Sequence, residues 1–497
     1  MKSIFEQAGD AISWRSLEQF GTRLIFLIRL IILIRLLSPE DFGLIAIATI
    51  AIDLLLSLTN LGMTQALIQL RVVDERHYNN AWTLEIIRGL SVTLVAFFSA
   101  PLVSHLFGEP GVEEIVRILA LRPLMDAAAS IKVVELTRNL NFRSISIIEL
   151  LKSLANTIVA VVFAKEFGAW ALVAGTLAGS ATYMWLSYYL APHRPQFIID
   201  SITIRSLIRF GRWVFLISLI VMVGQFFLRM IISRQLGTEE LGLYYLAASL
   251  AFLPLEMARL TVGEVAFPLY ARIQTDVFQT AQAFRTILIS LAVLLVPGIF
   301  LMIALTPSLI ENVLGAKWEG TAPIIQILAL SSLLGLLGET IVPIFYGSGR
   351  PDKVLVIEVV QTIVLISFVT LFINNFGVVG AALAWLPAIA ASQGICILFI
   401  HKVLPKPFYG LALPLGVLTI ISALATVFAI RVDRLLPGLF GLVSAAALGL
   451  FIVGVLIWIL ERRYRLGLSV GIVRGYPRLA AVVGLVPKEV SWPSHIG

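Results

Sequence analysis

Apolar stretches that are long enough to cross a bilayer as helices fill most of this 497-residue sequence. A spanning helix needs about 20 mostly apolar residues, and about fourteen stretches reach that length. Only 13% of the residues are charged, whereas a soluble domain carries about 25%. The sequence therefore predicts an all-α polytopic membrane protein, with spans at 16–37, 42–68, 81–104, 115–138, 144–164, 168–190, 208–233, 241–263, 284–309, 323–346, 354–374, 378–401, 409–430 and 437–460.

The charges of the connecting loops alternate between the two predicted sides of the membrane. Lys and Arg gather in one set of loops, as at Arg138 and Arg143, whereas the other set, which includes SPED and GTEE, is poor in both. Because cytoplasmic loops carry the excess of Lys and Arg, both termini are expected in the cytoplasm. The net charge of +7 follows from this bias, so no nucleic acid is expected as a partner. The one cysteine, Cys396, excludes an internal disulfide and a multi-cysteine metal site.

Two parts of the chain repeat each other. The segment 14–44 returns at 213–243 with matching Trp, Arg, Leu, Glu and Gly residues, at an offset of 199 positions (213 minus 14). At an offset of 209 positions, ILAL at 118–121 returns at 327–330 and FG at 167–168 returns at 376–377. Matches at nearly one offset predict two pseudo-symmetric six-helix halves.

The predicted halves divide the chain into four regions. In transporters that are built from two such repeats, the substrate site lies between the halves near mid-depth. We therefore expect a central cavity between two lobes. The predicted regions are an N-terminal lobe at 1–200 (spans 1–6), a C-terminal lobe at 201–403 (spans 7–12), two extra helices at 404–461, and a basic cytoplasmic tail at 462–497.

The first predicted span carries three arginines, six residues apart: Arg23, Arg29 and Arg35. A charge at the centre of a spanning helix costs at least about 2.5–3.5 kcal/mol, so it normally faces a protein interior or a water-filled cavity. Six residues turn a helix by about 240°, so the three arginines do not share one face. Arg35 lies near the outer boundary and can also simply snorkel to it. Asp53, halfway down the second span, can reach the level of Arg29 and pair with it.

Other charges inside the predicted spans stand at helical spacings. Arg122 and Asp126, four residues apart, can form an ion pair on one helix face. Arg229 occupies nearly the place of Arg29 in the second repeat, one residue out of register. Glu339 has no partner nearby in the sequence, which suits a proton or sodium site. The three-residue spacing recurs in Glu85 with Arg88, Glu149 with Lys152, and Glu256 with Arg259, and each of these pairs can equally be a structural bridge.

These charges give two sets of candidate residues. Arginines outnumber acids in the first and seventh spans, which favours an anionic substrate, and guanidinium is the preferred partner of phosphate. The substrate-binding candidates are Arg23, Arg29, Arg35, Arg122, Arg229 and Arg259. The ion-coupling candidates are Asp53, Asp126, Glu256 and Glu339. Aromatic and glycine residues along 170–189 can stack on sugars, or can serve helix packing and an interfacial belt.

Signatures of an enzyme are missing from the sequence. It contains no G-x-S-x-G elbow, no Walker A loop and no H-E-x-x-H motif, which are common marks of hydrolases, NTPases and metalloproteases. No outer loop is long enough for a catalytic domain. A non-enzymatic transporter without cofactors, coupled to a H⁺ or Na⁺ gradient, is the leading prediction. The alternatives are an ion-coupled exporter of small molecules, a membrane polysaccharide polymerase or glycosyltransferase, and a scaffold without transport.

Several segments resemble a known family in their order and spacing. They are LLSPEDFGL, NLGMTQALIQ, RNLNFR, and LGAKWEGTAPIIQILAL with YGSGRP. They resemble the polysaccharide transporter family, the oligosaccharide-lipid flippases of bacterial exopolysaccharide and lipopolysaccharide assembly. This family lies within the multidrug/oligosaccharidyl-lipid/polysaccharide exporter superfamily. The resemblance implies fourteen helices in two lobes that open alternately to each side of the bacterial inner membrane.

The resemblance also implies a substrate and partners. Members of the family move undecaprenyl-diphosphate-linked repeat units from the cytoplasmic to the outer leaflet, among membrane lipids and beside polysaccharide polymerase and export machinery. Related lipid II flippases place arginines in their first helix, so the likeness makes Arg23 and Arg29 the candidates that contact the diphosphate or an acidic sugar. Their basic cluster early in the second helix is absent here, where Asp53 stands instead. A peptidoglycan precursor is therefore not the expected substrate.

Overall fold

The computed structural model describes residues 4–59, 67, 73–139, 141–198, 212–256, 276–436 and 438–464, and the single positions 259, 266, 269, 270 and 273. In these residues every regular element is helical, and ten helices are long and apolar enough to cross a membrane. The predicted all-α membrane fold is therefore confirmed. The helices are α1 (Ile4–Leu36), α2 (Pro39–Thr59), α4 (Glu75–Phe107), α5 (Val112–Leu119), α6 (Leu121–Ala127), α7 (Val133–Arg138), α8 (Phe142–Phe167), α9 (Ala169–Leu190), α11 (Arg212–Leu236), α12 (Thr238–Ala251), α14 (Val277–Leu309), η1 (Ile310–Leu314), η2 (Ala316–Trp318), α15 (Thr321–Gly347), α16 (Pro351–Leu383), α17 (Trp385–Val403), α18 (Ala412–Leu435) and α19 (Gly438–Tyr464).

The chain divides into two compact units. The first comprises Met1–Tyr245 and Val369–Val378, and the second comprises Leu246–Phe368 and Val379–Gly497. Helix α11 and the first turns of α12 therefore belong to the first unit. The predicted lobes at 1–200 and 201–403 and the extra helices at 404–461 stay predictions. Most of the predicted tail, from residue 465 on, lies outside the described residues.

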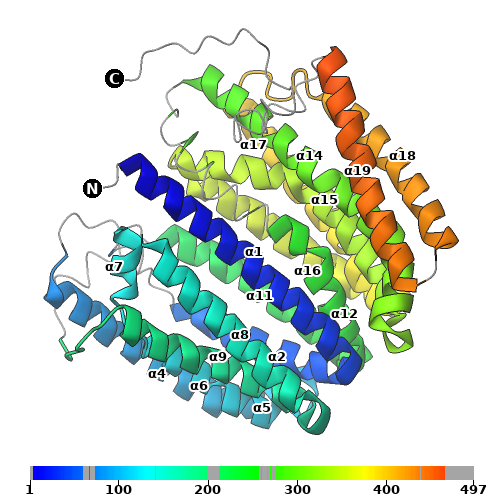
Figure 1. Ribbon diagram of the computed structural model, residues 1–497. Coiled ribbons are helices and arrows are strands. Elements are labelled where there is room, and N and C mark those ends of the chain that lie inside the picture. Colours follow the sequence, from blue (N-terminus) through cyan, green and yellow to red (C-terminus); the bar gives the residue numbers. More distant parts are fainter. Residues whose placement is uncertain are drawn as a thin grey trace. The chain divides into compact units, whose positions relative to one another are not determined.

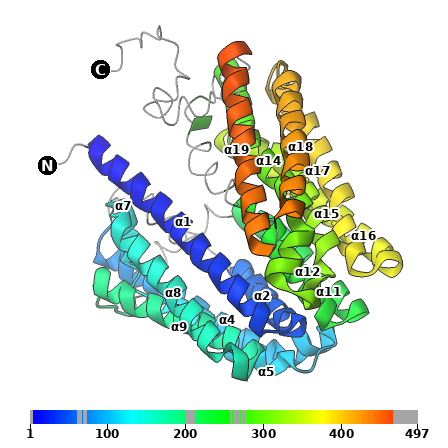
Figure 2. The same ribbon diagram turned by 45° about the vertical axis from the view of Figure 1, so that its right-hand side comes forward.

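Long helices pack side by side within each unit. In the first unit, α8 packs along both α9 and α1, as Figures 1 and 2 show from two directions, and α2 packs against α11. In the second unit, α14 packs against α15 and α18, and α18 packs along α19. The close pairing of α1 with α8 determines which residues face the arginines of the first helix.

The fourth predicted span is broken. Residues 115–138 form α5, α6 and α7 instead of one helix, so the prediction of a continuous span there is wrong. Backbone groups that a break frees inside a membrane need new hydrogen-bond partners. The Thr93 hydroxyl donates to the carbonyl of Ala120 at 2.7 Å, and the Tyr188 hydroxyl donates to the carbonyl of Ala128 at 3.0 Å. Side chains of α4 and α9 thus donate hydrogen bonds to the carbonyls at the breaks. The apolar length of the segment alone does not reveal these breaks.

Two glycines of the duplicated sequence share one unusual conformation. Gly168, between α8 and α9, has φ 53° and ψ −129°. Gly377, which interrupts α16, has φ 57° and ψ −142°. Positive φ is readily available only to glycine. The helix break that Gly377 makes therefore corresponds to the boundary between α8 and α9, as duplication of the FG pair predicts.

The first turns of α2 and α12 cross at a second pair of matched glycines. A Cβ atom on Gly43 would lie 2.0 Å from the carbonyl oxygen of Thr238, and one on Gly242 would lie 1.7 Å from the carbonyl oxygen of Pro39. The offset of 199 relates Gly43 to Gly242 and Pro39 to Thr238. The glycine of each repeat thus lies against the backbone of the other repeat, and this reciprocal pattern is typical of a two-fold contact. Only glycine allows so close an approach.

The last turn of α11 also binds the end of α4, on the predicted outer side. Arg234 Nε donates to the carbonyl of Leu106 at 2.9 Å, and its Nη2 donates to the carbonyl of His105 at 2.8 Å. The Thr238 hydroxyl donates to Glu109 Oε2 at 2.6 Å. A cation at a helix C-terminus satisfies carbonyls that have no partner within the helix. Helices α2, α4, α11 and α12 are therefore joined at this end.

Candidate functional site

Arg29 lies in α1, and neutral groups surround it. Its Nη1 donates to Asn156 Oδ1 in α8 at 2.5 Å, and its guanidinium carbon lies 5.9 Å from the centre of the Phe26 ring. It also interacts electrostatically with Tyr245 in α12. The Arg29 side chain is half-buried. Among the described residues, no carboxylate forms an ion pair with Arg29, so its positive charge is not neutralised by an acid.

The other two arginines of α1 have different surroundings. Arg23 is half-buried and lies six residues, about 9 Å along the helix, toward the predicted cytoplasmic side. Arg35 lies exposed in the last turn of α1, which suits the interpretation that it snorkels. The side chains of the three arginines therefore do not meet at one point. This agrees with the prediction from their spacing that they do not share one helix face.

Arg122 in α6 lies between two carboxylates. Its Nη1 is 3.5 Å from Asp53 Oδ1 in α2, and its Nε is 3.5 Å from Asp126 Oδ2. The four-residue pair of Arg122 and Asp126 is therefore confirmed, whereas the predicted pairing of Asp53 with Arg29 is wrong. Arg29 and Asp53 belong to helices with different neighbours: α1 packs against α8, whereas α2 packs against α4, α5 and α11. The position of a residue within its predicted span does not reveal which neighbouring helix its side chain contacts.

Arg229 in α11 is the second cation with mainly neutral neighbours. Its Nη1 donates to the carbonyl of Ala46 in α2 at 3.1 Å, and its guanidinium carbon lies 5.5 Å from the centre of the Tyr245 ring. Asp53 interacts with Arg229 electrostatically, but these two residues form no ion pair within 4.0 Å in the described structure. Tyr245 thus interacts with both Arg29 and Arg229, which the sequence alone placed in different halves.

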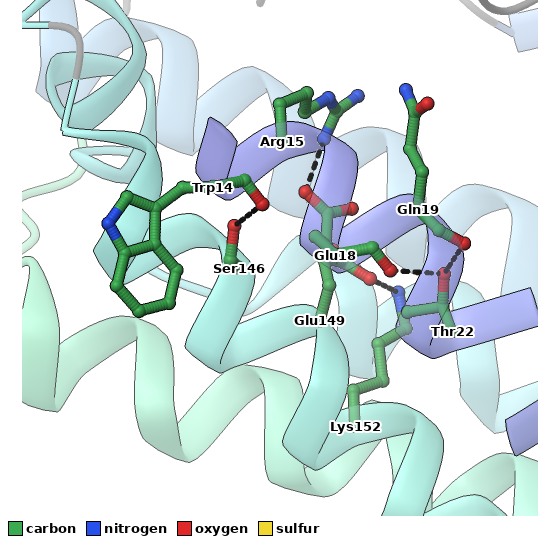
Figure 3. A network of polar contacts seen from close by, with 8 residues as sticks. All are labelled: Trp14, Arg15, Glu18, Gln19, Thr22, Ser146, Glu149 and Lys152. Atoms are coloured by element: carbon green, nitrogen blue, oxygen red, sulfur yellow. Dashed lines mark hydrogen bonds and ion pairs between the residues drawn. The ribbon is translucent and has the colours of Figure 1, made fainter. Parts of the chain in front are cut away.

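A further basic group lies in α8, close to α1. Lys152 Nζ is 3.3 Å from Glu149 Oε2 and 4.7 Å from the centre of the Tyr183 ring. Figure 3 shows Glu149 and Lys152 below the first half of α1. The predicted three-residue pair of Glu149 with Lys152 is confirmed, as is the pair of Glu85 with Arg88, in which Arg88 Nε donates to Glu85 Oε2 at 2.8 Å.

Polar contacts fasten the first half of α1 to α8. The Ser146 hydroxyl of α8 donates to the carbonyl of Trp14 at 3.1 Å, as Figure 3 shows. Within α1, Arg15 Nη1 pairs with Glu18 Oε2 at 2.8 Å, and the Thr22 hydroxyl donates to the carbonyl of Glu18 at 2.8 Å. The carboxylate of Glu18, which is 7% exposed, therefore has a cationic partner. The anchored helix brings Arg29, farther along α1, to the side chain of Asn156.

The second unit contains an arginine with a strong carboxylate partner. Arg259 Nε lies 3.0 Å from Glu339 Oε2, and its Nη2 lies 2.7 Å from Glu339 Oε1. Glu339 thus has no partner nearby in the sequence, as predicted, but it is not an unpaired carboxylate, because its partner Arg259 lies 80 residues away. Glu256, which the spacing paired with Arg259, contributes to the electrostatic surroundings of that arginine, but the bidentate partner is Glu339. Glu358 in α16 interacts electrostatically with both members of the pair.

The aromatic and glycine residues of α9 serve packing more than a ligand. A Cβ atom on Gly175 would lie 2.7 Å from the carbonyl oxygen of Asn156, so this glycine sets the distance between α9 and α8. Trp185 and Tyr189 are 73% and 80% exposed on the outer surface of the helix, as in an interfacial belt. Only Tyr183 contacts a member of the charged site, Lys152. The interpretation as helix packing thus fits most of these residues.

Sequence reasoning missed four residues near these charges: Asn156, Tyr183 as a partner of Lys152, Tyr245 and Glu358. Asn156 and Glu358 are polar residues within predicted spans, so a search for every polar residue inside the spans could have found both. The role of Tyr245 depends on the contact of α12 with α11 and gives no signal in the sequence. Among the described residues, no three His, Cys, Asp or Glu side chains are placed to hold a metal ion.

Comparison with known proteins gives the site its context. A family model described as "Polysaccharide biosynthesis protein" matches residues 32–323, more than half of the chain. The chain belongs to this family. The resemblance seen in the sequence is therefore confirmed. The polysaccharide biosynthesis family is one of transporters, so the protein is not an enzyme.

Relatives match the chain over most of its length. The succinoglycan biosynthesis transport protein ExoT of Rhizobium meliloti (strain 1021) is 25% identical over 68% of this chain and 69% of its own. The lipopolysaccharide biosynthesis protein WzxC of Escherichia coli (strain K12) is 23% identical over 82% of this chain and 83% of its own. With ten helices in the described part of the chain that are long and apolar enough to cross a membrane, this family member is a multi-pass membrane protein.

A solved structure shares the fold. The lipid II flippase MurJ, in an inward closed conformation, superposes with a TM-score of 0.72 at 16% sequence identity, over 91% of this chain and 99% of that structure. At this level of identity the likeness establishes the fold alone. This chain and that flippase thus share one helical architecture.

Proposed function

We propose that this protein is a flippase that moves undecaprenyl-diphosphate-linked oligosaccharide repeat units across the bacterial inner membrane by alternating access, for exopolysaccharide or lipopolysaccharide assembly. Two relatives are named for succinoglycan and lipopolysaccharide biosynthesis, and one of them is named a transport protein. The fold of a lipid II flippase is compatible with the translocation of a large lipid-linked head group. Membrane lipids surround the substrate's tail, and a polysaccharide polymerase with its export machinery would receive the flipped unit.

One observation carries this proposal: within the described residues, neither Arg29 nor Arg229 forms an ion pair with a carboxylate, although Asp53 interacts with Arg229 electrostatically. Each donates to a neutral acceptor, an amide oxygen or a backbone carbonyl, and both interact with Tyr245. A charge at such a depth is costly and marks a substrate or ion pathway. Phosphate is the anion that guanidinium groups prefer. A diphosphate carries enough negative charge to form ion pairs with both arginines.

The other candidates divide into two groups by their partners. Arg23 and Arg35 lie toward opposite ends of α1, so we assign them to entry and exit of the anionic head group. Arg122 and Arg259 are held by carboxylates in this structure. Substrate phosphate would have to compete with those carboxylates, so we assign both arginines to steps in which the ion pairs open.

Ion coupling is proposed for the acids of these pairs. Protonation of Asp53 and Asp126 would release Arg122, and protonation of Glu339 would release Arg259, with Glu256 nearby. A H⁺ gradient could then exchange the carboxylate partner of each arginine for a substrate phosphate. A Na⁺ ion bound to the same carboxylates would likewise release the arginines from their ion pairs. The dependence of flipping on an imposed H⁺ or Na⁺ gradient in proteoliposomes measures this coupling.

The test of the function is flipping of a labelled undecaprenyl-diphosphate oligosaccharide in proteoliposomes. We expect the native chain to expose the sugar on the opposite face, and Arg29→Ala to lower the rate about tenfold or more, since a charge-assisted hydrogen bond contributes about 1.5–3 kcal/mol. Arg462→Ala is the control, because Arg462 stacks on Trp458 far from α1 in the sequence. A native chain that moves only small ions or drugs, or that lengthens glycans, would refute the proposal.

A further inference from the structure

We infer that Asn156 is a positioning residue for Arg29, which orients the guanidinium while leaving its charge free for an anion. The inference rests on the proposed function, because it concerns how the arginine of that site is prepared for a phosphate. Asn156 lies in α8 and was not marked by any charge or motif. Its contribution is specific to the amide: the side chain has the shape of Asp but no negative charge.

The first step of the argument is the hydrogen bond itself. Arg29 Nη1 donates to Asn156 Oδ1 at 2.5 Å across 127 residues of sequence. A guanidinium has five N–H donors in a planar fork, so this bond fixes the plane of the fork and leaves donors for a ligand. A carboxylate in the same place would form an ion pair, as it does with Arg122 and Arg259, and would compete with phosphate.

The second step is the packing that holds Asn156 in place. Gly175 and Gly179 of α9 lie four residues apart, a spacing that lets two helices approach closely. A Cβ atom on Gly175 would lie 2.7 Å from the Asn156 carbonyl oxygen and 3.0 Å from its Oδ1, and one on Gly179 would lie 3.3 Å from its Cβ. Asn156 therefore fills the narrow contact between α8 and α9. Its Oδ1 lies against Gly175 of α9 and at the same time accepts the hydrogen bond from Arg29 of α1, so the packing of α9 restrains the amide.

The third step is the contrast with the neighbouring basic group. Lys152, one helical turn before Asn156 on α8, is paired with Glu149 at 3.3 Å. Helix α8 thus presents one compensated cation and, next to it, one neutral acceptor to α1. The amide of Asn156 orients the Arg29 guanidinium without neutralising its charge. If Asn156 served packing alone, the charge of the side chain at position 156 would not matter.

The experiment compares Asn156→Asp with Asn156→Ala in the full-length protein. Binding of a soluble short-chain prenyl diphosphate is measured by calorimetry in detergent, and flipping of the lipid-linked oligosaccharide is measured in proteoliposomes. Asn156→Asp preserves shape but adds a carboxylate beside Arg29, so we expect the affinity for the diphosphate to fall about tenfold or more. Asn156→Ala keeps the charge of Arg29 uncompensated and loses only its orientation, so we expect a fall of about threefold.

A packing role predicts the opposite order, because Asp is nearly isosteric with Asn and Ala leaves a void. Equal or stronger binding by Asn156→Asp than by Asn156→Ala would therefore overturn the inference, even where flipping by the native chain upholds the proposed function. Thermal unfolding of both variants shows whether either has lost its fold, and Gly179→Ala, which perturbs packing but adds no charge, serves as a second variant. A native chain that neither binds the diphosphate nor flips the lipid contradicts both the inference and the function.

Discussion

The partner of each intramembrane arginine separates two kinds of charge in this protein. Arg122 and Arg259 bind carboxylates, at 3.5 Å and 2.7 Å respectively. Arg29 and Arg229 instead donate to an amide oxygen and a carbonyl oxygen. The first kind stabilises the conformation seen here, whereas the second kind keeps a charge that a ligand can use. Both kinds are arginines in apolar helices, so only their neighbours distinguish them.

Removal of Arg122 is predicted to destabilise the first unit. Asp53 and Asp126 would then lose the cation that they share, and a polar group that loses its partner costs about 1–3 kcal/mol when buried. Their side chains are 41% and 36% exposed, so water reduces the cost of Arg122→Gln to about 1 kcal/mol. Thermal unfolding of the purified protein measures this. Asp126→Asn added to Arg122→Gln should restore part of the loss, and an unchanged melting temperature for Arg122→Gln alone would rule the prediction out.

The residue-level contacts show which parts of the site the sequence could predict. The pairs within one helix, such as Arg122 with Asp126 and Glu149 with Lys152, followed from spacing and are confirmed. The contact between Arg259 and Glu339 did not follow, because it depends on which helices pack together. Hydrophobic patterning predicts that a helix spans the membrane, but the arginines of α1 lie on different faces, so the pattern does not reveal which face meets α8.

At the scale of helices, close crossings at glycines connect the two repeats. The first turns of α2 and α12 approach so closely that any Cβ atom at Gly43 or Gly242 meets a backbone carbonyl at 2.0 Å or less. The end of α11 meanwhile holds the end of α4 through Arg234. We propose that these contacts close the predicted outer side of the transport path and must separate when it opens.

Gly43→Ala and Gly242→Ala are predicted to impair this crossing. The backbone carbonyls cannot move away without shifting a whole helix, so each variant should lower the melting temperature and slow flipping. Gly298→Ala is the matched control: Gly298 lies within α14 with no atom within 4 Å of its added Cβ, so alanine should be neutral or stabilise the helix by up to about 1 kcal/mol. Equal melting temperatures for the Gly43 and Gly298 variants would contradict the close crossing.

The helices also show why the fourth span defied prediction. The segment has the length of a spanning helix, yet the chain forms α5, α6 and α7 there. Side-chain hydroxyls of Thr93 and Tyr188 satisfy the carbonyls that the breaks release. Donors so far away in the sequence cannot be assigned to a break before the packing of α4 and α9 is known. The FG repeat, in contrast, located the break at Gly377 correctly, because a glycine with positive φ is a local requirement.

At the scale of the whole molecule, the loop charges predict an orientation in the membrane. The loop charges predict that both termini, and the turn before α4, face the cytoplasm, whereas the turn between α1 and α2 faces outward. Single cysteines at the exposed positions Glu40 and Arg76, in a Cys396→Ala background, report this orientation through labelling of intact cells with an impermeant maleimide. Cys396 is buried, so its loss should not disturb the surface. We expect label at Glu40→Cys only; label at Arg76→Cys alone would invert the orientation.

The protein is a transporter of the polysaccharide biosynthesis family, and we propose that Arg29 and Arg229, which form no ion pair with a carboxylate in the described residues, recognise a diphosphate. Family membership and fold were accessible from the sequence, since repeats and loop motifs extend over most of its length. The pairing of Arg29 and Arg229 around Tyr245 was not accessible, because it combines three helices of the first unit.

The most direct test compares flipping of one oligosaccharide carried by undecaprenyl diphosphate and by undecaprenyl monophosphate. The native protein should prefer the diphosphate, because the second phosphate engages the second guanidinium. Arg29→Gln combined with Arg229→Gln should move both lipids at similar, low rates, while Arg462→Gln keeps the native preference. If the double variant still prefers the diphosphate as strongly as the native chain does, the two arginines are not the site that reads it.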